Sequence, residues 1–205
     1  MQLLELESGH GFGYAVRAAL EHVRTPYVLV VQHNRPFTRP VDLSRIVGTM
    51  EADPARFKYV ALPTLANVGD QEKAFSQHGI RTDPITVDDE GLQLVPLLQW
   101  YDSTHVCSTS HYLNFVFGEK KLVARGSFIE DTLGQAQLAD IRARGQAAAH
   151  PDYGTFLASG DGFSEPCVGY IDGRDAAATT ASKLKCARGE DAEPEPEQPP
   201  HLHAR

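Results

Sequence analysis

Residues 3–35 read LLELESGHGFGYAVRAALEHVRTPYVLVVQHNR, and this stretch decides the fold that the sequence predicts. The apolar residues at 3–6 predict a short strand, and apolar residues recur at helical spacing over residues 14–24. Residues 27–31 form a continuous apolar run, which is typical of a strand buried on both faces. Strand, helix and strand in this order predict an α/β, Rossmann-like fold with a mixed, mainly parallel sheet flanked by helices.

A polar tip of Gln32, His33 and Asn34 follows the second apolar run directly. Ligands of parallel α/β sheets bind at the carboxyl ends of the strands, so these three side chains are candidates for substrate binding. One imidazole and two amides suit Mg²⁺ poorly, because hard cations prefer carboxylate oxygens. Substrate binding, a plain turn and metal binding are therefore all open at this tip.

The rest of the chain continues the alternation of helices and strands. Further helices are predicted over residues 43–50, with Asp42 as N-cap, and over residues 70–78 and 133–144. Further strands are predicted over residues 58–62, 85–87, 92–98, 121–124 and 168–171. Residues 150–166 predict a loop. Residues 176–205, which are acidic and proline-rich beyond Gly189, predict a disordered tail.

Residues 98–135 mix large aromatics with polar side chains more densely than any other part of the sequence. Trp100, Asp102 and His105 lie close together there, as they would in the wall of a ligand pocket. A polar core beside a hairpin, with every group hydrogen-bonded, explains the same pattern. Both interpretations are open.

The acidic pair Glu130 and Asp131 stands just before the helix predicted over residues 133–144. Acids in this position compensate the helix dipole and cap the first turn. A carboxylate held in a partly dry pocket also acts as a general base toward a hydroxyl nucleophile. The two roles are compatible, because capping would hold the side chain in place.

The Gly-rich residues 8–13 lie between a predicted strand and a predicted helix. A phosphate group could bind at the N-terminus of that helix. With Glu5, the segment also partly matches the E-x-G-x-G-x-G loop and so resembles the adenosylmethionine-binding turn of Rossmann methyltransferases. A plain tight turn is the competing interpretation.

Composition narrows the class of protein. The 205 residues carry a formal net charge of -8, which argues against broad binding of nucleic acid or anionic membranes. No apolar run approaches the roughly 18–20 residues of a membrane span. Cysteines 107, 167 and 186 form neither a metal-binding pair nor an even disulfide set, which predicts a reducing, cytoplasmic location.

Two blocks of sequence together resemble the family 2 glycosyltransferases, which have the GT-A nucleotide-sugar fold. Residues 11–34 are similar to the family's "G…A.N.GL…A…Y.L.LD.D" passage, and residues 126–131 are similar to its "ED" motif. The chain departs from the family at Arg17, where Asn is usual, and at Asn34, where a metal-binding acid is expected. The family's first strand lies upstream of residue 9, so the resemblance implies an N-terminally incomplete domain over residues 1–175.

The resemblance implies an inverting, non-processive transfer of sugar from a nucleotide-sugar donor to a hydroxyl acceptor. Asp131 would be the catalytic base, with Glu130 beside it, and a divalent metal such as Mg²⁺ or Mn²⁺ would assist. Trp100 would flank the acceptor, with Asp102 as a polar partner. The alternatives are an adenosylmethionine-dependent methyltransferase and a non-catalytic, sugar- or nucleotide-binding remnant of the fold.

Overall fold

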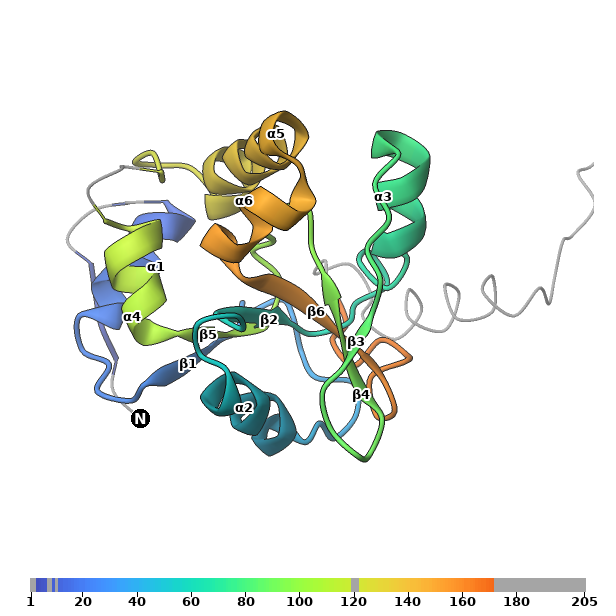
Figure 1. The fold of residues 1–205 in the computed structure, drawn as a ribbon. Coiled ribbons are helices and arrows are strands. Elements are labelled where there is room, and N and C mark those ends of the chain that lie inside the picture. Colours follow the sequence, from blue (N-terminus) through green and yellow to red (C-terminus); the bar gives the residue numbers. More distant parts are fainter. Residues whose placement is uncertain (1–2, 7–8, 10, 119–121, 172–205) are drawn as a thin grey trace, which may run out of the picture. The chain divides into compact units, whose positions relative to one another are not determined.

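A six-stranded mixed sheet organises this computed structural model, which describes residues 3–6, 9, 11–118 and 122–171 (Figure 1). The compact unit that contains the sheet ends at Tyr170, and the tail predicted over residues 176–205 lies outside the described residues. In sheet order the strands are β1 (Tyr27–Val30), β5 (His105–Ser108), β2 (Tyr59–Ala61), β6 (Thr155–Gly160), β4 (Leu92–Pro96) and β3 (Ile85–Thr86).

Only one strand pair in this sheet is parallel, namely β2 with β6. Strand β5 runs antiparallel to both of its neighbours, β1 and β2, and β4 runs antiparallel to β6 and β3. The prediction of a mixed sheet is confirmed, whereas the prediction of a mainly parallel one is wrong. The continuous apolar run at residues 27–31 is instead half-buried at the sheet edge, where β1 pairs with β5 alone among the described strands.

The strand–helix–strand unit predicted over residues 3–35 lacks its first strand. Residues 3–6 pair with no described strand, and the side chain of Leu3 is exposed. The helix α1 (Phe12–Leu20) and the strand β1 do form as predicted. A short apolar run does not show which strand it pairs with, so four residues were not enough to predict a place in the sheet.

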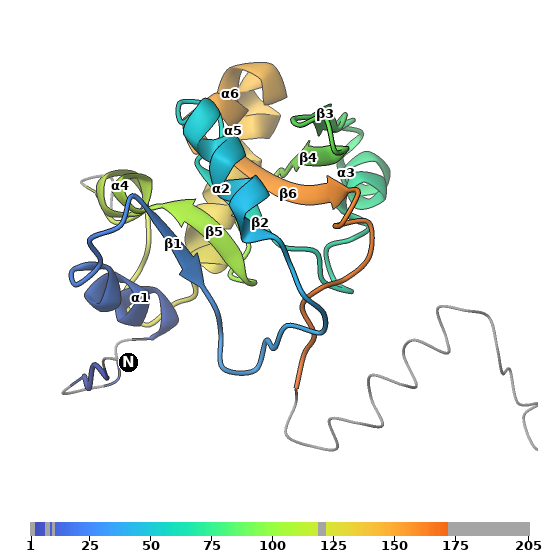
Figure 2. The ribbon, with the colours of Figure 1, turned by 90° about the horizontal axis from the view of Figure 1, so that it is seen from below.

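The inner strands of the sheet are buried on both faces, and successive residues of a strand point to opposite faces. Tyr59 and Ala61 of β2 belong to one apolar cluster, and Val60 belongs to another. Helix α2 (Leu43–Ala52) covers the face that Figure 2 turns toward the viewer and contributes Ile46 and Met50 to the second cluster. The opposite face carries α5 (Gln135–Arg144) and α6 (Gln146–Tyr153) (Figure 1).

Most of the predicted helices are confirmed. Asp42 caps α2 by accepting a hydrogen bond from the main-chain N–H of Ser44, and α3 spans Asp70–His78. Two short π-helical segments, η1 (Tyr112–Val116) and η2 (Glu130–Gly134), follow α4 (Thr109–His111) and precede α5 respectively. No helix in the described part of the chain is long and apolar enough to cross a membrane.

The loop predicted over residues 150–166 is wrong, since it holds the end of α6 and the whole of β6. Pro151 favoured the loop prediction, yet it lies within α6. The strand predicted over residues 121–124 is absent from its described part, residues 122–124. In place of a strand over residues 168–171, Val168 forms isolated bridges to Phe37 and Thr64.

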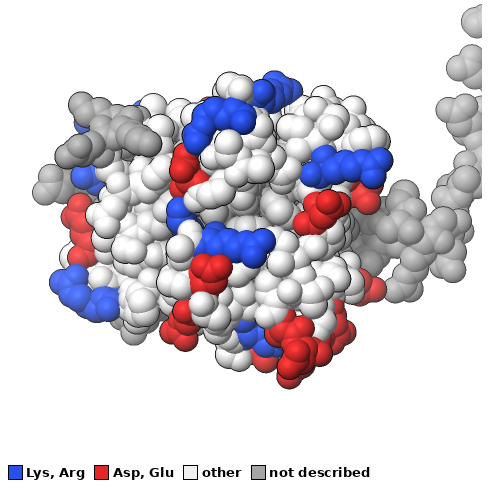
Figure 3. All heavy atoms as spheres, viewed as in Figure 1, with Lys and Arg blue, Asp and Glu red and all other residues white. Residues whose placement is uncertain are grey.

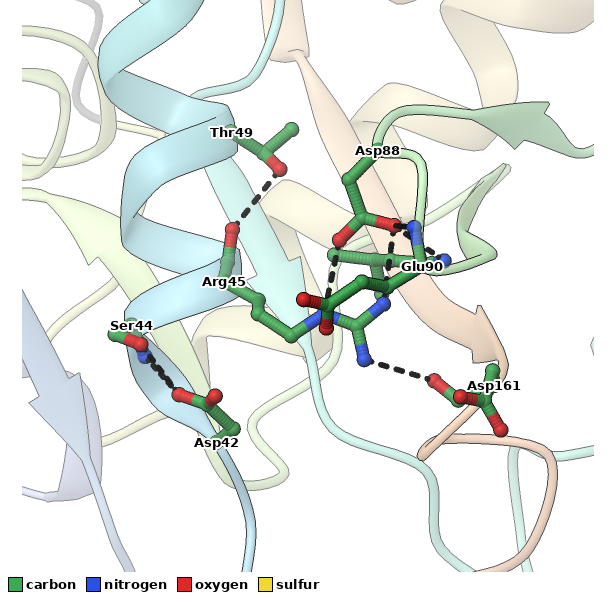
Figure 4. A network of polar contacts seen from close by, with 8 residues as sticks. Asp42, Ser44, Arg45, Thr49, Asp88, Glu90 and Asp161 are labelled. Atoms are coloured by element: carbon green, nitrogen blue, oxygen red, sulfur yellow. Dashed lines mark hydrogen bonds and ion pairs between the residues drawn. The ribbon is translucent and has the colours of Figure 1, made fainter.

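An ion-pair network ties α2 to the tip of the β3–β4 hairpin (Figure 4). The Arg45 guanidinium donates from Nε and Nη2 to the two carboxylate oxygens of Asp88, over 2.8 and 3.0 Å. Asp88 Oδ1 also accepts from the main-chain N–H groups of Glu90 and Leu92 and so shapes the turn. Asp88 is therefore paired with a cation and also holds the turn through main-chain hydrogen bonds.

Candidate functional site

A polar pocket of about 410 Å³ lies at one edge of the sheet. Strands β1 and β2 both run antiparallel to β5, so their carboxyl ends meet there beside the amino end of β5. The predicted location of the polar tip therefore holds, although the sheet is mainly antiparallel. The pocket is lined by Gln32, Asn34, Arg35, Thr64, Ala66, Asn67, Tyr101, Asp102, Ser103, Phe128 and Glu130.

Two of the three polar side chains predicted at the β1 tip line this pocket. The Gln32 amide donates from Nε2 to the main-chain oxygen of Asp102 over 2.8 Å, which ties the tip to the segment before β5. Asn34 lines the pocket, and its buried Oδ1 accepts no hydrogen bond from the described residues. His33 is exposed and is not part of the pocket lining.

Asp102 and Glu130 hold each other through two reciprocal hydrogen bonds. The main-chain N–H of Asp102 donates to Glu130 Oε2 over 3.0 Å, and the main-chain N–H of Glu130 donates to Asp102 Oδ2 over 3.2 Å. Asp102 thus accepts from the first turn of η2, where main-chain N–H groups have no partner within the helix. The sequence predicted that the acidic pair itself caps this helix. The structure differs, because the cap comes from Asp102 in a distant segment.

The Asp102 carboxyl is 2% exposed, and burial raises its pKa to about 7. The main-chain N–H of Glu130 opposes this rise, whereas the nearby Glu130 carboxylate adds to it. The indole N–H of Trp100 also lowers the pKa, although it lies outside hydrogen-bond geometry. Among the described residues, no partner hydrogen-bonds to Asp102 Oδ1, although this oxygen is buried.

Glu130 and Asp131 occupy different environments, although they are adjacent in sequence. Glu130 is half-buried, lines the pocket and is held by Asp102, whereas Asp131 is exposed and outside the pocket lining. The segment begins as a π-helix, a rare form that often occurs at functional sites. Gly134 permits its close approach to Trp100, because a Cβ there would lie 2.8 Å from the Trp100 main-chain oxygen.

Trp100 belongs to the apolar core and not to the pocket wall. It is 1% exposed and packs against Tyr59 with ring centroids 4.2 Å apart, and against Tyr112 at 5.3 Å. The structure therefore places the indole in the core and not in the pocket lining, where its predicted stacking role would require it. Sequence could not separate a core aromatic from a pocket aromatic, because both types satisfy the same apolar pattern.

His105 is likewise fully buried, next to Trp100 in the core. Its Nδ1 faces the carbonyl oxygen of Ser103, which can only accept, so Nδ1 carries the proton. Nε2 then accepts from the Tyr112 hydroxyl over 2.6 Å. Burial lowers the pKa of His105 to about 4, which keeps the ring neutral at neutral pH. His105 supports the pocket floor and does not line the pocket.

Seven of the eleven pocket-lining residues were not predicted as site residues, and Phe128 and Arg35 are two of these seven. Phe128 is 47% exposed at the rim and stacks on Phe12, with ring centroids 5.5 Å apart and an interplanar angle of 26°. Arg35 lines the pocket and lies over the ring of Tyr170, 4.8 Å from the ring centroid. In the sequence, the only indication that Phe128 and Arg35 belong to the site was that each lies next to predicted site residues.

The Gly-rich segment before α1 packs against the loop that carries Phe128. Gly11 has φ +77°, and a Cβ there would lie 2.6 Å from the main chain of Gly126. The N–H of Gly13 donates to the carbonyl oxygen of Ser127 over 3.3 Å. These contacts explain Gly11 and Gly13 by close main-chain packing, as expected for the tight-turn interpretation.

A divalent metal finds a weak donor set here. The described residues contain no group of three or more His, Cys, Asp or Glu side chains that could hold a metal ion. The β1 tip contributes the carboxamide of Asn34, and the pocket adds only two carboxylates, Asp102 and Glu130. Asp102 has a pKa near 7 and so is only partly charged at neutral pH, which does not favour Mg²⁺ or Mn²⁺.

Comparisons with known proteins do not add to this picture. No protein-family model, no curated protein and no solved structure matches the chain. On the face drawn in Figure 3, basic and acidic side chains lie interspersed over most of the surface, and several acidic side chains gather at its lower edge. The function must therefore be argued from the pocket itself.

Proposed function

We propose that this chain is a GT-A-like domain of an inverting, family 2-type glycosyltransferase, in which the pocket beside Glu130 receives a hydroxyl acceptor. One observation carries the proposal: a half-buried carboxylate, Glu130, is held toward a pocket whose other polar groups suit hydroxyl recognition. The resemblance of residues 11–34 and 126–131 to the family is consistent with it, because both blocks contribute pocket residues.

The chemistry requires one proton acceptor. The acceptor hydroxyl oxygen attacks the anomeric carbon of a nucleotide sugar and forms the new glycosidic bond. The bond from that carbon to the diphosphate breaks on the opposite face, its electron pair leaves with the nucleotide, and the configuration inverts. The hydroxyl proton passes to a carboxylate on the attacking side, as general-base catalysis requires.

We assign this role to Glu130 and treat Asp131 as the competing assignment that the resemblance favours. Oε2 of Glu130 is fixed by the Asp102 N–H, so the carboxylate is oriented before a substrate binds. Asp131 has no comparable restraint from a described hydrogen bond and is exposed. A base that is held at the pocket wall meets the geometric requirement for proton transfer.

The test is a transfer assay with a matched pair of variants. The donors are UDP-glucose, UDP-galactose, UDP-N-acetylglucosamine and GDP-mannose, each with and without Mn²⁺, and nucleotide release and glycoside formation are measured. Glu130→Gln keeps the side-chain shape and removes the base, so transfer should fall by about 10²–10⁴-fold. Asp131→Asn is the matched control and should keep wild-type activity.

Each other outcome has a definite meaning. Loss of transfer in Asp131→Asn alone assigns the base to Asp131. Binding of nucleotide sugars or saccharides without turnover, detected by shifts of the Asn34 side-chain amide in NMR spectra, favours the non-catalytic remnant. Neither binding nor turnover with any donor rejects the glycosyltransferase proposal, and binding of adenosylmethionine would favour the methyltransferase.

A further inference from the structure

A second pocket, of about 510 Å³, shares no lining residue with the pocket beside Glu130. Strand β6 runs parallel to β2, so its first residues lie toward the end of the sheet opposite the carboxyl end of β2. Six lining residues of the second pocket are apolar, namely Ala55, Ile85, Pro96, Ala147, Pro151 and Phe156. A largely apolar pocket of roughly 300–1,000 Å³ with a few polar groups is typical of small-molecule sites.

The floor of this pocket is a row of packed side chains. Phe156 is buried between Phe57 and His150, whose ring centroids lie 5.0 and 4.9 Å from its own. Both contacts are edge-on, which is a geometry that aromatic rings favour. The Arg56 guanidinium lies over the Phe57 ring, 5.3 Å from its centroid. The row therefore places a cation at one end and an imidazole at the other.

His150 offers the pocket a hydrogen-bond acceptor. Its Nε2 lies 2.8 Å from the main-chain oxygen of Thr155, which can only accept, so Nε2 carries the proton and Nδ1 does not. No described residue hydrogen-bonds to Nδ1, and this nitrogen is not among the fully buried polar atoms, so a ligand can reach it. Burial lowers the pKa of His150, and the charges of Arg56 and Lys58 lower it further, which keeps the ring neutral at neutral pH.

The same pocket offers donors for an anion. The exposed Arg56 side chain forms no ion pair or hydrogen bond with a described residue. Helix α6 has no side-chain cap, so the N–H groups of Gln146 and Ala147, which line the pocket, lack a partner within the helix. Helical side chains lean toward the N-terminus, which brings His150 over this turn. The acid of the lining, Asp53, accepts through Oδ1 from the main-chain N–H of Arg56.

We propose that this second pocket binds a small, apolar carboxylic acid that also carries a hydroxyl group, such as phenyllactate. The carboxylate accepts from the Arg56 guanidinium and from the first N–H groups of α6, and its charge complements both. The hydroxyl donates to Nδ1 of His150, and the apolar body packs on Ile85 and Pro96. This inference is independent of the proposed function.

Calorimetric titration of the full chain with phenyllactate and two analogues tests the ligand class. Phenylpropanoate lacks the hydroxyl and should bind about three- to tenfold more weakly, because one neutral hydrogen bond is lost. Phenyllactamide lacks the charge and should bind about tenfold more weakly or worse, because charge-assisted hydrogen bonds are lost. The Nδ1 resonance of His150 should shift with phenyllactate and much less with phenylpropanoate.

Arg56→Met should weaken the binding of phenyllactate by about tenfold or more, since the cation of the site is removed. Arg81→Met is the matched control, because Arg81 is also exposed, lies over a phenylalanine ring, that of Phe75, and is not part of the pocket lining. It should bind phenyllactate as the wild type does. Both variants should keep the wild-type melting profile, because both side chains are exposed.

Equal binding of phenyllactate by Arg56→Met and the wild type overturns the inference, as does a wild type that does not bind it. Equal affinities for phenyllactate and phenylpropanoate reject the hydroxyl contact and with it the ligand class. A shift of the Asn34 side-chain amide in place of the His150 Nδ1 would put the ligand in the pocket beside Glu130 and would also overturn the inference. The two pockets share no lining residue, so none of these outcomes changes the test of the proposed function.

Discussion

Two acidic clusters of this protein differ in how their charge is satisfied. Asp88 meets the Arg45 guanidinium through two hydrogen bonds and accepts two main-chain N–H groups as well (Figure 4). Asp102 faces another carboxylate, Glu130, and forms no ion pair with a described Arg, Lys or His. The surroundings of Asp88 stabilise its charged form, whereas the surroundings of Asp102 destabilise its charged form.

The pKa values move in opposite directions for this reason. The hydrogen bond from Arg45 is the largest cause that lowers the pKa of Asp88, whereas burial is the largest cause that raises the pKa of Asp102. A carboxylate whose oxygens are all hydrogen-bonded within the protein stabilises the fold and is not available to bind a ligand. An acid with a raised pKa and an unfilled oxygen marks a candidate functional site.

The largest expected effect is on the pH dependence of stability. Folded Asp102 keeps its proton up to a pH of about 7, whereas the unfolded carboxyl loses it near pH 4. The folded state therefore binds more protons between these pH values, and this group makes the free energy of unfolding fall as pH rises. Asp102→Asn removes the effect, which amounts to about 4 kcal/mol.

Urea unfolding of the wild type and of Asp102→Asn at pH 4–8 measures how the free energy of unfolding depends on pH in each protein. The stability of the variant relative to the wild type should increase steadily from pH 4 to pH 8. His105, with a pKa of about 4, has the opposite slope below pH 6.5, but it is present in both proteins and cancels in the difference. A constant difference across the range would mean that Asp102 titrates alike in both states.

A smaller effect is expected from breaking the satisfied cluster. Arg45→Met leaves Asp88 without its cation, at side-chain exposures of 15% for Arg45 and 25% for Asp88. Loss of a fully buried pair partner costs about 3–5 kcal/mol, and partial exposure reduces this to about 2 kcal/mol. Chemical denaturation at pH 7 measures the loss.

The matched control is Arg144→Met, which removes exposed ion pairs to Asp140 and Asp152. Its expected cost is much smaller than that of Arg45→Met, because solvent screens these pairs. Equal losses in the two variants would show that the Arg45 network is no better satisfied than a surface pair, and the comparison between the two acidic clusters would fail.

The smallest effect concerns Asp88 itself in acid. Its folded pKa is lower than its unfolded pKa, so its stabilising contribution is present above about pH 4 and is lost as pH falls through the folded value. The stability gap between wild type and Asp88→Asn should therefore narrow in acid, measured by thermal melting from pH 5 to pH 2. A gap that widens in acid would contradict the assigned direction.

The described α2 and α3, the β3–β4 hairpin and the location of the pocket were all predictable from sequence. Local signals sufficed there: Asp42 caps α2 as predicted, and the acidic turn separates the two hairpin strands. Strand β6 and helix α6 were missed, because Pro151 and nearby glycines suggested a loop. Strand β6 lies between β2 and β4 in the sheet, so its formation depends on distant partners.

The sequence by itself determined which residue types could form the site: the polar tip after β1, the aromatic segment around Trp100, and the pair Glu130 and Asp131. Only the tertiary structure decided which of them meet in one pocket. Burial and hydrogen-bond partners depend on segments far apart in the chain, as when Asp102 receives the N–H of Glu130. For the same physical reason Trp100 lies in the core while Phe128, which no sequence pattern singled out, lines the pocket.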